Sequence, residues 1–429
     1  MGHGRVGAHQ AEVEVPAMSA RIGFVHFGTY PDIRVVKMTD TLAKAGYEVI
    51  LLARNIKGVS EPGASHPYAH LLSQKGEEWR GRLQIRRLLD EIPERWRAPL
   101  TLPYHVNPVW RRAIRDLVVR DGCRLLIVRD MPLVLAATAV GRRYGVPVIF
   151  DMAENYPAAL SVWRRYEGVA SYVKNAFIRN VTLARLVERM AARASDHVFV
   201  VVHESAERVE QLGVSLDRIT VVENTPDLEA YKNVLPAVQV EALTVVYTGE
   251  IHLYRGIPTT LEAANILYQR GEQCLWWFVG SGKLMDHLRS RSAHLEQAGV
   301  VVWHGWKPHS EMLAILSSGH VGIVPHIVSE HTHNTMPNKV YDYMAFRKPV
   351  LVSDCRPMRR LVEEVGCGLV FCSQSAEDLA EKVLILRDPA LRAEMGERGR
   401  KAVEERYNWS VDGQKLLEVV GALLSQEEA

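Results

Sequence analysis

The sequence predicts an α/β protein with two doubly wound domains in tandem, and two observations lead to this fold class. Short apolar runs alternate with helical stretches along most of the 429 residues, which is typical of parallel sheets covered by helices. The alternation stops near residue 227 and restarts near residue 241, so each half builds its own sheet. We expect the carboxyl ends of both sheets to face a shared cleft, where open α/β sheets bind ligands.

The first half supplies the elements of an amino-terminal domain. A strand at Ile22–Phe27 is followed by a turn that contains Gly28 and by a helix over Val35–Ala45. Residues 1–17 lack an apolar core, so we expect a disordered extension there and place the domain at residues 18–228. Its further strands are expected at Val49–Ala53, Leu125–Val128, Pro147–Phe150, Val198–Val202 and Ile219–Val222.

A second domain repeats the pattern after a linker at residues 229–240. We place it at residues 241–404, and residues 405–429 follow it as a final helix. Its strands are expected at Leu243–Tyr247, Trp276–Val279, Val300–Trp303, Val321–Val324, Val350–Val352 and Leu369–Phe371.

Two stretches of the first domain, Trp79–Trp96 and Trp163–Arg189, are dense in arginine with apolar residues between. One interpretation is that they are the solvated faces of amphipathic helices. The other is that they form a platform for an anionic membrane surface or a lipid-phosphate acceptor. The basic residues that would form this platform are Arg82, Arg86, Arg87, Arg164 and Arg165. We expect no nucleic-acid partner.

Composition points to a reduced compartment. The formal net charge is +2, and the five cysteines are an odd number without a C-x-x-C pair. No apolar run approaches the roughly 18–20 residues of a membrane-spanning helix. We therefore expect a cytoplasmic protein, either free or peripheral on the inner face of the membrane.

The most informative stretch begins at Asn334 and Thr335, passes Pro337 and enters a short helix. A helix amino terminus offers unpaired N–H groups and a positive dipole end, which suits phosphate. Lys339 adds a mobile positive charge, and Asp342 follows one helical turn later. A carboxylate can accept hydrogen bonds from two adjacent hydroxyls, as in ribose. This segment, including Asn338, therefore predicts a nucleotide site.

Three earlier turns from strand to helix carry glycine. Arg255 can fork onto a phosphate, and Gly256 permits close approach of the backbone. The Gly280–Gly282 turn resembles the start of a dinucleotide fingerprint, but the third glycine and the later acidic residue are missing. Each turn alone is a weak signal, whereas their order along one sheet edge is a strong one. The remaining residues of these turns are Gly249, Glu250, Ser281, Gly305 and Trp306.

Together these segments resemble the family 4 glycosyltransferases, which have the two-Rossmann GT-B fold. The resemblance runs from about Ile22 to Trp409. In the second domain it is carried by Gly249, Arg255-Gly256, Gly280-Ser281-Gly282, Gly305, Pro337-Asn338-Lys339, Asp342-Tyr343-Met344 and Lys348-Pro349-Val350. In the first domain it is carried by Gly28–Arg34, Val128-Arg129-Asp130, Phe150–Pro157 and Asn224–Asp227.

The resemblance implies a role for several of these residues. Arg255 matches the position that holds the donor pyrophosphate, and Asp342 matches the family's second Glu, which binds ribose. Gly280 and Trp306 match positions where backbone approaches the nucleoside. Gly28 matches a loop that faces the donor phosphate. The resemblance also implies that residues 405–429 form a closing helix that crosses back to the first domain.

From the residues and the resemblance together we expect a set of site residues. The catalytic group comprises Arg255, Lys339 and Glu154, and the acceptor is expected to contact Arg34, Asp130 and Glu154. The donor is expected to contact Gly28, Gly249, Glu250, Arg255, Gly256, Gly280, Ser281, Gly282, Trp306, Asn334, Thr335, Pro337, Asn338, Lys339 and Asp342.

Three positions depart from the family pattern. Glu250 stands where a second basic residue is usual, so Lys339 or Arg34 would have to replace its charge. Asn334 stands where a Glu binds hydroxyls of the donor sugar, and an amide can still hydrogen-bond a sugar. Ala153 stands where many members have His, which leaves Glu154 as the nearest polar candidate.

A rival hypothesis is a metal site in the histidine-rich segment His326, Glu330, His331 and His333, with His320 nearby. Its spacing fits no standard helix motif, and the chain has no Asp-x-Asp pair. We expect a polar loop beside the donor site, no metal and no cofactor.

The expected function is retaining transfer of a sugar from a nucleotide diphosphate, with UDP as the first expectation and GDP as the second. The acceptor is a sugar, a lipid-linked molecule or a small molecule in bacterial glycoconjugate, polysaccharide or natural-product assembly. Two alternatives stay open: a nucleotide-sugar 2-epimerase on the same fold, and a non-catalytic degenerate transferase that acts as a binding partner.

Overall fold

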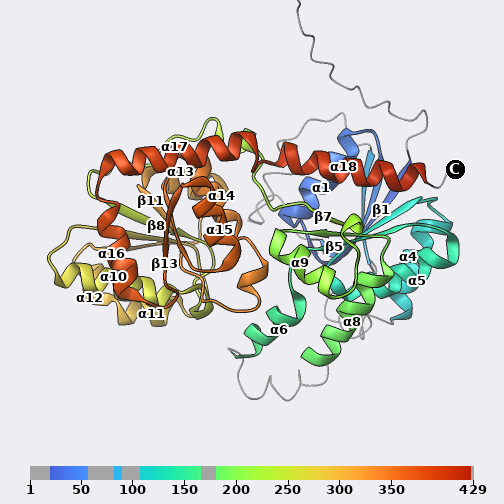
Figure 1. The fold of residues 1–429 in the computed structure, drawn as a ribbon, viewed down its shortest axis with the longest axis horizontal. Coiled ribbons are helices and arrows are strands. Elements are labelled where there is room, and N and C mark those ends of the chain that lie inside the picture. Colours follow the sequence, from blue (N-terminus) through green and yellow to red (C-terminus); the bar gives the residue numbers. More distant parts are fainter. Residues whose placement is uncertain (1–19, 57–81, 89–106, 166–179, 427–429) are drawn as a thin grey trace, which may run out of the picture.

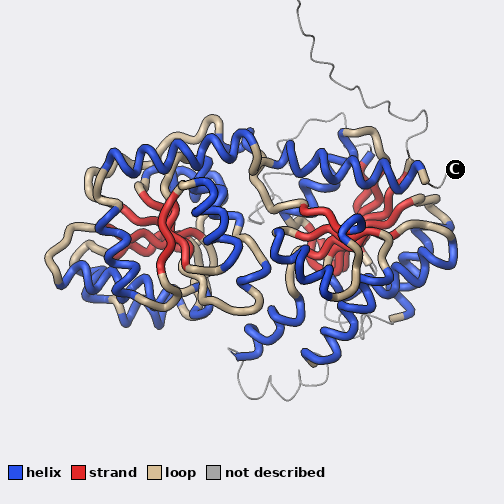
Figure 2. Tube along the Cα trace, viewed as in Figure 1, coloured by secondary structure: helices blue, strands red, loops and turns tan. Residues whose placement is uncertain are grey.

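The protein contains two α/β domains side by side in a computed structural model that describes residues 20–56, 82–88, 107–165 and 180–426 (Figure 1). Each domain has a parallel sheet with helices packed around it (Figure 2). This arrangement confirms the predicted fold class. The expected disordered extension at residues 1–17 lies outside the described residues.

The first domain holds a parallel sheet of seven strands in the order β3-β2-β1-β4-β5-β6-β7. The central strand β1 pairs with both β2 and β4, so that Phe24 lies opposite Leu51 and Ile127. All three side chains are buried, which explains the continuous apolar runs in the sequence. The strands are β1 (Arg21–Tyr30), β2 (Glu48–Ile56), β3 (Leu83–Arg87), β4 (Leu125–Arg129), β5 (Val148–Met152), β6 (His197–Val200) and β7 (Ile219–Val221).

Strand β1 extends further than its apolar run predicts. The pairing with β2 is irregular between His26 and Thr29, and it then resumes to Tyr30. Gly28 therefore lies in a bulge of a strand, where we had expected a turn, and a Cβ atom there would come within 2.7 Å of the His26 imidazole.

Strand β3 corrects our interpretation of the first arginine-rich stretch. Leu83–Arg87 forms an edge strand with alternating burial, whereas an amphipathic helix face was one of the two expectations. Leu83 and Ile85 pack against the core of the domain, and Arg86 forms an ion pair with Asp121 at 2.6 Å. Only residues 82–88 of this stretch are described. Alternation over five residues is a short signal, which the neighbouring arginines obscured.

Helices cover both faces of the first sheet. Asp32 caps the first of them, accepting hydrogen bonds from the backbone N–H groups of Arg34 and Val35 at 3.0 and 3.1 Å. The helices of this domain are α1 (Ile33–Lys44), α4 (Pro108–Val119), α5 (Val134–Tyr144), α6 (Tyr156–Arg165), α8 (Val181–Ala194) and α9 (His203–Gln211).

The second domain holds a parallel sheet of six strands in the order β10-β9-β8-β11-β12-β13. Its strands lie within about one residue of the expected bounds, except that β10 ends two residues later. They are β8 (Thr244–Thr248), β9 (Leu275–Val279), β10 (Val301–Gly305), β11 (Val321–Val324), β12 (Val350–Ser353) and β13 (Gly368–Phe371).

The helices of the second domain pack on both faces of this sheet and build two cores. In the short helix α14, the buried residues are Val340, Tyr341, Tyr343, Met344 and Ala345. The Tyr343 ring packs directly over Gly322 of β11. The helices are α10 (Ile257–Gln269), α11 (Met285–Arg291), α12 (Ala293–Gln297), α13 (His309–Ser318), α14 (Asn338–Ala345), α15 (Arg356–Val365), α16 (Ala376–Ile385) and α17 (Pro389–Glu405).

The last helix, α18 (Trp409–Ser425), leaves the second domain and packs on the first (Figure 1). Leu416 and Val420 are fully buried in the core that contains strand β1. Trp409 donates from its indole N–H to Thr41 of α1 at 2.9 Å. The chain therefore crosses between the domains twice. No described helix combines the length and the apolar character needed to cross a bilayer.

Candidate functional site

A cleft of about 580 Å³ lies between the two domains, and both contribute to its walls. Arg129 is the last residue of β4, and Thr248 and Val279 are the last residues of β8 and β9. Glu154 follows β5 closely and lies on the same side. The cleft therefore lies at the carboxyl ends of both sheets, where open α/β folds place their ligands.

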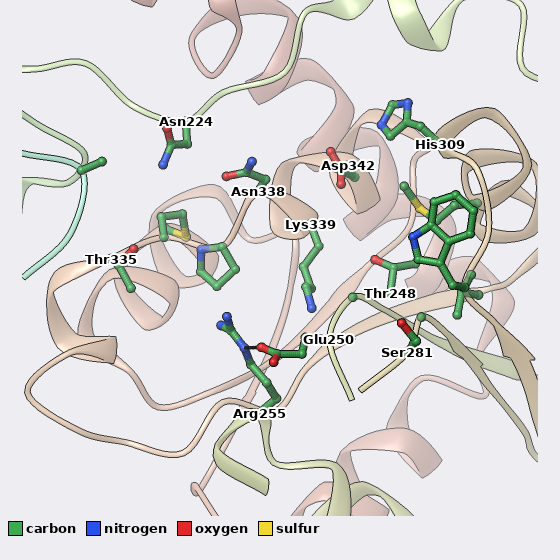
Figure 3. Close-up of a pocket in the computed structure, with 18 of the residues that line it drawn as sticks. Asn224, Thr248, Glu250, Arg255, Ser281, His309, Thr335, Asn338, Lys339 and Asp342 are labelled. Carbon is green, nitrogen blue, oxygen red and sulfur yellow. Dashed lines mark ion pairs between the residues drawn. The ribbon is translucent and has the colours of Figure 1, made fainter. Parts of the chain in front are cut away.

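Twelve of the expected site residues line this cleft. They come from the turns after β5, β8, β9 and β10, from the segment before α10 and from the start of α14, and Figure 3 shows many of their side chains directed into one space. They are Glu154, Gly249, Glu250, Arg255, Gly280, Ser281, Trp306, Thr335, Pro337, Asn338, Lys339 and Asp342.

Two basic residues, Arg255 and Lys339, lie on the second-domain wall of the cleft. The side chains of Lys339 and Arg255 converge with Glu250 on one side of the cleft (Figure 3). The Lys339 ammonium lies 4.1 Å from the centre of the Tyr247 ring. Burial, together with the nearby Arg255, holds the pKa of Lys339 well below its ordinary value. An arriving pyrophosphate would supply the negative charge that such a buried amine lacks.

The turn after β8 is shaped to admit Lys339. Gly249 has a φ of 125°, and a Cβ atom there would come within 2.6 Å of the Lys339 Nζ. Any other residue would strain the backbone and displace the ammonium. Gly249 therefore matters for the position of the cation as well as for the turn.

Arg255 is held from behind by a histidine. Its Nη1 lies 3.3 Å from the Nε2 of His326, which is buried beneath the cleft. Burial keeps the pKa of His326 well below its ordinary value, so the neutral ring can accept this hydrogen bond. Glu250 lies 3.9 Å from the Arg255 Nε and also accepts a hydrogen bond from Tyr254. The guanidinium is thus positioned before any ligand arrives.

Gly256 and Gly282 support the site from outside the cleft. A Cβ atom on Gly256 would come within 1.7 Å of the Pro325 carbonyl, and one on Gly282 within 2.0 Å of the Ile251 carbonyl. Both glycines therefore allow backbone to pack against backbone. We had expected them to contact the donor, and the structure places neither in the cleft wall.

Helix α14 begins inside the cleft. Its N-cap position is Pro337, which has no side chain to satisfy the first N–H groups. Asn338 and Lys339 form the first turn, and both line the cleft. These free donors and the positive end of the helix dipole suit an anion.

Asp342 lies one turn along α14 and also faces the cleft (Figure 3). Its Oδ1 accepts a hydrogen bond of 2.7 Å from Tyr231, which comes from the segment between the domains. Burial raises the pKa of Asp342 to about 6, while Tyr231 and Lys339 oppose that shift. Tyr231 fixes the carboxylate through one oxygen.

Trp306, Lys307 and His309 form another wall of the cleft with Met312. The Trp306 side chain is 42% exposed, which is unusual for an indole and leaves its ring free for stacking.

Four expected site residues lie elsewhere. Gly28 lies in the β1 bulge, outside the cleft wall. Arg34 is 2% exposed, and its guanidinium pairs with the fully buried Asp151 at 2.7 Å and donates to the Val222 carbonyl at 2.9 Å. Removing one partner of such a pair costs about 3–5 kcal/mol, so Arg34 holds the first domain together, and it is not part of the cleft wall.

Asp130 and Asn334 are not part of the cleft wall. Asp130 has a φ of 63°, which is strained for a residue with a side chain, and its carboxylate lies 3.3 Å from Arg129. Burial raises the pKa of Asp130 to about 7. Asn334 donates from its amide to the Glu330 carbonyl at 2.7 Å. Both residues therefore support neighbours that do line the cleft, and our expectation of direct sugar contact has no geometric support.

Several cleft residues escaped the sequence prediction. Arg129 and Thr248 are the last residues of their strands. Because open α/β sheets bind ligands at the carboxyl ends of their strands, both residues could have been predicted from the sequence. His331 was visible only as a member of the histidine-rich segment. The other residues missed are Asn224, Val279, Lys307, His309, Met312 and Met336.

The histidine-rich segment is dispersed. His326 contacts Arg255, and His333 accepts from the backbone N–H of Arg356 at 3.2 Å. His320 accepts from the backbone N–H of Thr244 at 3.1 Å. Across the described ranges, no three His, Cys, Asp or Glu side chains are grouped to hold a metal ion.

Two family models match the chain. The model of glycosyl transferases group 1 matches residues 236–402, and the model of a glycosyl transferase 4-like domain matches residues 32–225. Each model falls on one of the two sheets that form the cleft. The chain belongs to the family 4 glycosyltransferases.

Other members of the glycosyltransferase class are similar in sequence or fold. An alpha-D-kanosaminyltransferase of Streptomyces kanamyceticus is 25% identical over 173 residues, which is 40% of this chain and 44% of the relative. The chain spans about half the length of the curated relatives it matches.

Solved structures show the same GT-B fold. Sucrose-phosphate synthase of Thermosynechococcus elongatus matches with a TM-score of 0.71 at 17% identity, over 95% of this chain and 100% of that one. Alr3699/HepE of Anabaena, in complex with UDP and glucose, matches with a TM-score of 0.67 at 12% identity, over 94% and 100%.

Proposed function

We propose that this protein is a retaining glycosyltransferase that moves a sugar from a nucleotide diphosphate to an acceptor held by the first domain. One observation carries the proposal. The second-domain wall brings Arg255 and Lys339 to the same side of the cleft, and Asp342 follows Lys339 by one helical turn. Pyrophosphate requires fixed cations, and the adjacent ribose requires a hydrogen-bond acceptor.

Each group has a part in the proposed chemistry. Negative charge grows on the leaving pyrophosphate, and Arg255, Lys339 and the start of α14 stabilise it. The resemblance implies attack on the leaving-group face, with the donor phosphate taking the acceptor proton. No protein nucleophile is then needed. Glu154 lies on the first-domain wall, and we propose that its carboxylate orients the acceptor hydroxyl.

The donor is a nucleotide diphosphate sugar, with UDP first and GDP second. The UDP bound to Alr3699/HepE, a protein of the same fold, supports this order. We propose that the reaction needs neither a metal nor another cofactor. The acceptor is a sugar, a lipid-linked molecule or a small molecule, in glycoconjugate, polysaccharide or natural-product assembly.

A thermal-shift screen with UDP, GDP, ADP, CMP and dTDP tests the donor site. A ligand that binds only the native state raises the midpoint, and at 100 times Kd the gain is about 2.7 kcal/mol. We expect one base to give the largest shift. An unchanged midpoint with all five nucleotides would contradict the proposal.

Incubation with radiolabelled sugar nucleotides then separates three functions. Transfer to an added acceptor, or slow hydrolysis without one, supports the transferase. Epimerisation of the donor would identify a 2-epimerase on this fold. Binding without any turnover would identify the degenerate binding partner.

We also propose peripheral attachment to an anionic membrane through α8. Leu183, Leu186 and Met190 recur at helical spacing on one side of α8 and are each more than half exposed. Arg189 and Arg193 are exposed on the same helix. An apolar stripe beside cations matches an interfacial helix. Arg86, which we had included in the basic platform, pairs with Asp121 instead.

Vesicle pelleting tests this attachment. We expect binding to anionic vesicles and release by salt, because each basic residue contributes about 1 kcal/mol and is screened over about 8–10 Å. Replacing Leu183, Leu186 and Met190 with serine should abolish binding, whereas Val119→Ser on α4, which is similarly exposed, should not. Equal binding to neutral vesicles would contradict the role of charge.

A further inference from the structure

The loop between β11 and α14 is fixed at both ends and in the middle. The His326 carbonyl accepts a hydrogen bond of 2.6 Å from Ser353, and Thr332 donates to the Ile327 carbonyl at 2.9 Å. The Asn334 carbonyl accepts from Ser205 of the first domain at 2.7 Å. Hydrogen bonds from several elements hold the loop, so the direction of its side chains is determined by the fold.

Glu330 ties the same loop to the other domain. Its carboxylate pairs with Arg185 of α8 at 2.9 Å and lies 3.4 Å from the amide nitrogen of Asn155. His331, the next residue, is turned into the cleft. The contacts on either side of His331 therefore belong to both domains, and its ring lies where the two walls meet.

The His331 ring is buried and has an unused polar atom. Only 9% of the residue is exposed, and its Nδ1 has no hydrogen-bond partner among the described residues. A buried polar atom without a partner costs about 1–3 kcal/mol. Because this Nδ1 has almost no accessible surface, a ligand in the cleft would reach the ring at its other edge.

Charges from both walls act on this ring. Burial lowers the pKa of His331, Arg255 lowers it further, and Glu154 of the first domain opposes both. The ring is therefore within electrostatic range of one residue on each wall of the cleft. Ala153, which also lines the cleft, offers only a methyl group there.

We infer that His331 hydrogen-bonds a hydroxyl of the sugar being transferred and thereby contributes to the choice of donor sugar. This inference rests on the proposed function. The transferred sugar is attached to the distal phosphate and is attacked by the acceptor, so it must lie between Arg255 and Glu154. His331 lines the cleft, and the charges of both residues act on its ring.

The chemistry of a neutral imidazole fits a hydroxyl better than a phosphate. A neutral ring offers one donor and one acceptor, which matches the O–H group of a sugar. A phosphate accepts only, and it already has Arg255 and Lys339. His331 is thus a specificity-determining residue, and the reacting proton need not pass through it.

Calorimetry on three variants tests the inference. The variants are His331→Ala, His331→Gln and the control His333→Ala, whose ring lies in the same loop but contacts the Arg356 backbone outside the cleft. The probes are UDP alone and UDP-glucose, UDP-galactose and UDP-N-acetylglucosamine, or GDP and GDP-mannose if the screen selects guanine. Thermal midpoints establish that each variant is folded.

We expect His331→Ala to bind the nucleotide diphosphate within twofold of wild type. The same variant should bind the preferred sugar nucleotide roughly 3- to 30-fold more weakly, which corresponds to one hydrogen bond and its unpaired partner. His331→Gln should restore part of this loss, and His333→Ala should change neither value.

Two results would overturn the assignment in different ways. If wild type binds nucleotides and His331→Ala weakens the diphosphate and its sugar conjugate equally, or weakens neither, His331 has no role toward the sugar. If wild type binds no nucleotide, the proposed function fails and the assignment fails with it. A changed order of preference among the three UDP-sugars would strengthen the assignment further.

Discussion

Arg255→Ala should reduce transfer severely while leaving the fold intact. In the structure the Arg255 side chain is 30% exposed and lines the cleft. Its Nη1 lies 3.3 Å from the Nε2 of His326, which holds the guanidinium in place. Its remaining N–H groups are therefore available for the donor pyrophosphate. A charge-assisted hydrogen bond contributes about 1.5–3 kcal/mol, so losing one predicts a roughly 10- to 150-fold fall in kcat/KM. Losing a bidentate pair predicts a fall of roughly 10² to 10⁴.

The substitution also leaves Glu250 without its cationic neighbour. Its carboxylate lies in the cleft wall, 3.9 Å from the Arg255 Nε, and would then repel the pyrophosphate. The double variant Arg255→Ala/Glu250→Gln should therefore recover part of the activity. Arg255→Lys keeps the positive charge but loses the two-pronged donor geometry of the guanidinium, so its kcat/KM should lie between those of wild type and Arg255→Ala.

The assay is initial-rate kinetics with the sugar nucleotide identified by the thermal screen. The control is Arg270→Ala, which removes a surface pair with Glu381 far from the cleft and should change kcat/KM by less than about twofold. Folding is checked by circular dichroism, since exposing the buried His326 costs about 1–3 kcal/mol. A folded Arg255→Ala enzyme with wild-type kcat/KM would refute the assignment.

The remaining predictions concern binding, protonation, stability and metals. Asp342→Ala should raise the nucleotide Kd more than it slows chemistry, and Asp342→Glu should restore much of the affinity. Because the carboxylate must be ionised to accept ribose hydroxyls, affinity should fall below about pH 6, the pKa of Asp342, and Asp342→Asn should remove this dependence. Because burial lowers the pKa of Lys339 and a bound pyrophosphate should raise it, nucleotide binding should be accompanied by proton uptake on Lys339, seen as a buffer-dependent calorimetric enthalpy that Lys339→Met abolishes. Leu416→Ala should cost about 2–5 kcal/mol in denaturant unfolding, since Leu416 is fully buried; a loss below 1 kcal/mol would contradict its place in the core. Activity should survive EDTA, and stoichiometric zinc whose removal abolishes transfer would show that the histidine segment binds metal.

The sequence predicted the second domain more accurately than the first. Its strands are short and apolar, three of them end at or just before a glycine, and the segment Val321–Val324 coincides with β11. The first domain has an edge strand among arginines and a bulge after His26, and neither follows from local pattern. The alternating burial of β3 becomes visible only in the structure, where β3 pairs with β2.

Which of the expected residues lie in the cleft depends on contacts distant in sequence. Arg34 resembles a phosphate ligand until Asp151, which is 117 residues away, is seen to pair with it. Asn334 and His331 are three residues apart in one loop, and only the contacts to Glu330 and Ser205 decide which of them turns into the cleft. Periodicity cannot resolve direction within a loop, because loops have no repeat.

The return of α18 to the first domain has a consequence for synthesis. Trp409, Leu416, Val420 and Leu424 complete the core around β1, so the domain that leaves the ribosome first is finished last. At about 5–20 residues per second, roughly 10–40 s separate the end of the first sheet from the arrival of α18. During that interval α1 covers only part of that apolar face of the first sheet, whereas the second domain already has all of its own strands and helices. The nascent chain is therefore expected to need protection from aggregation at its first domain until α18 has been made.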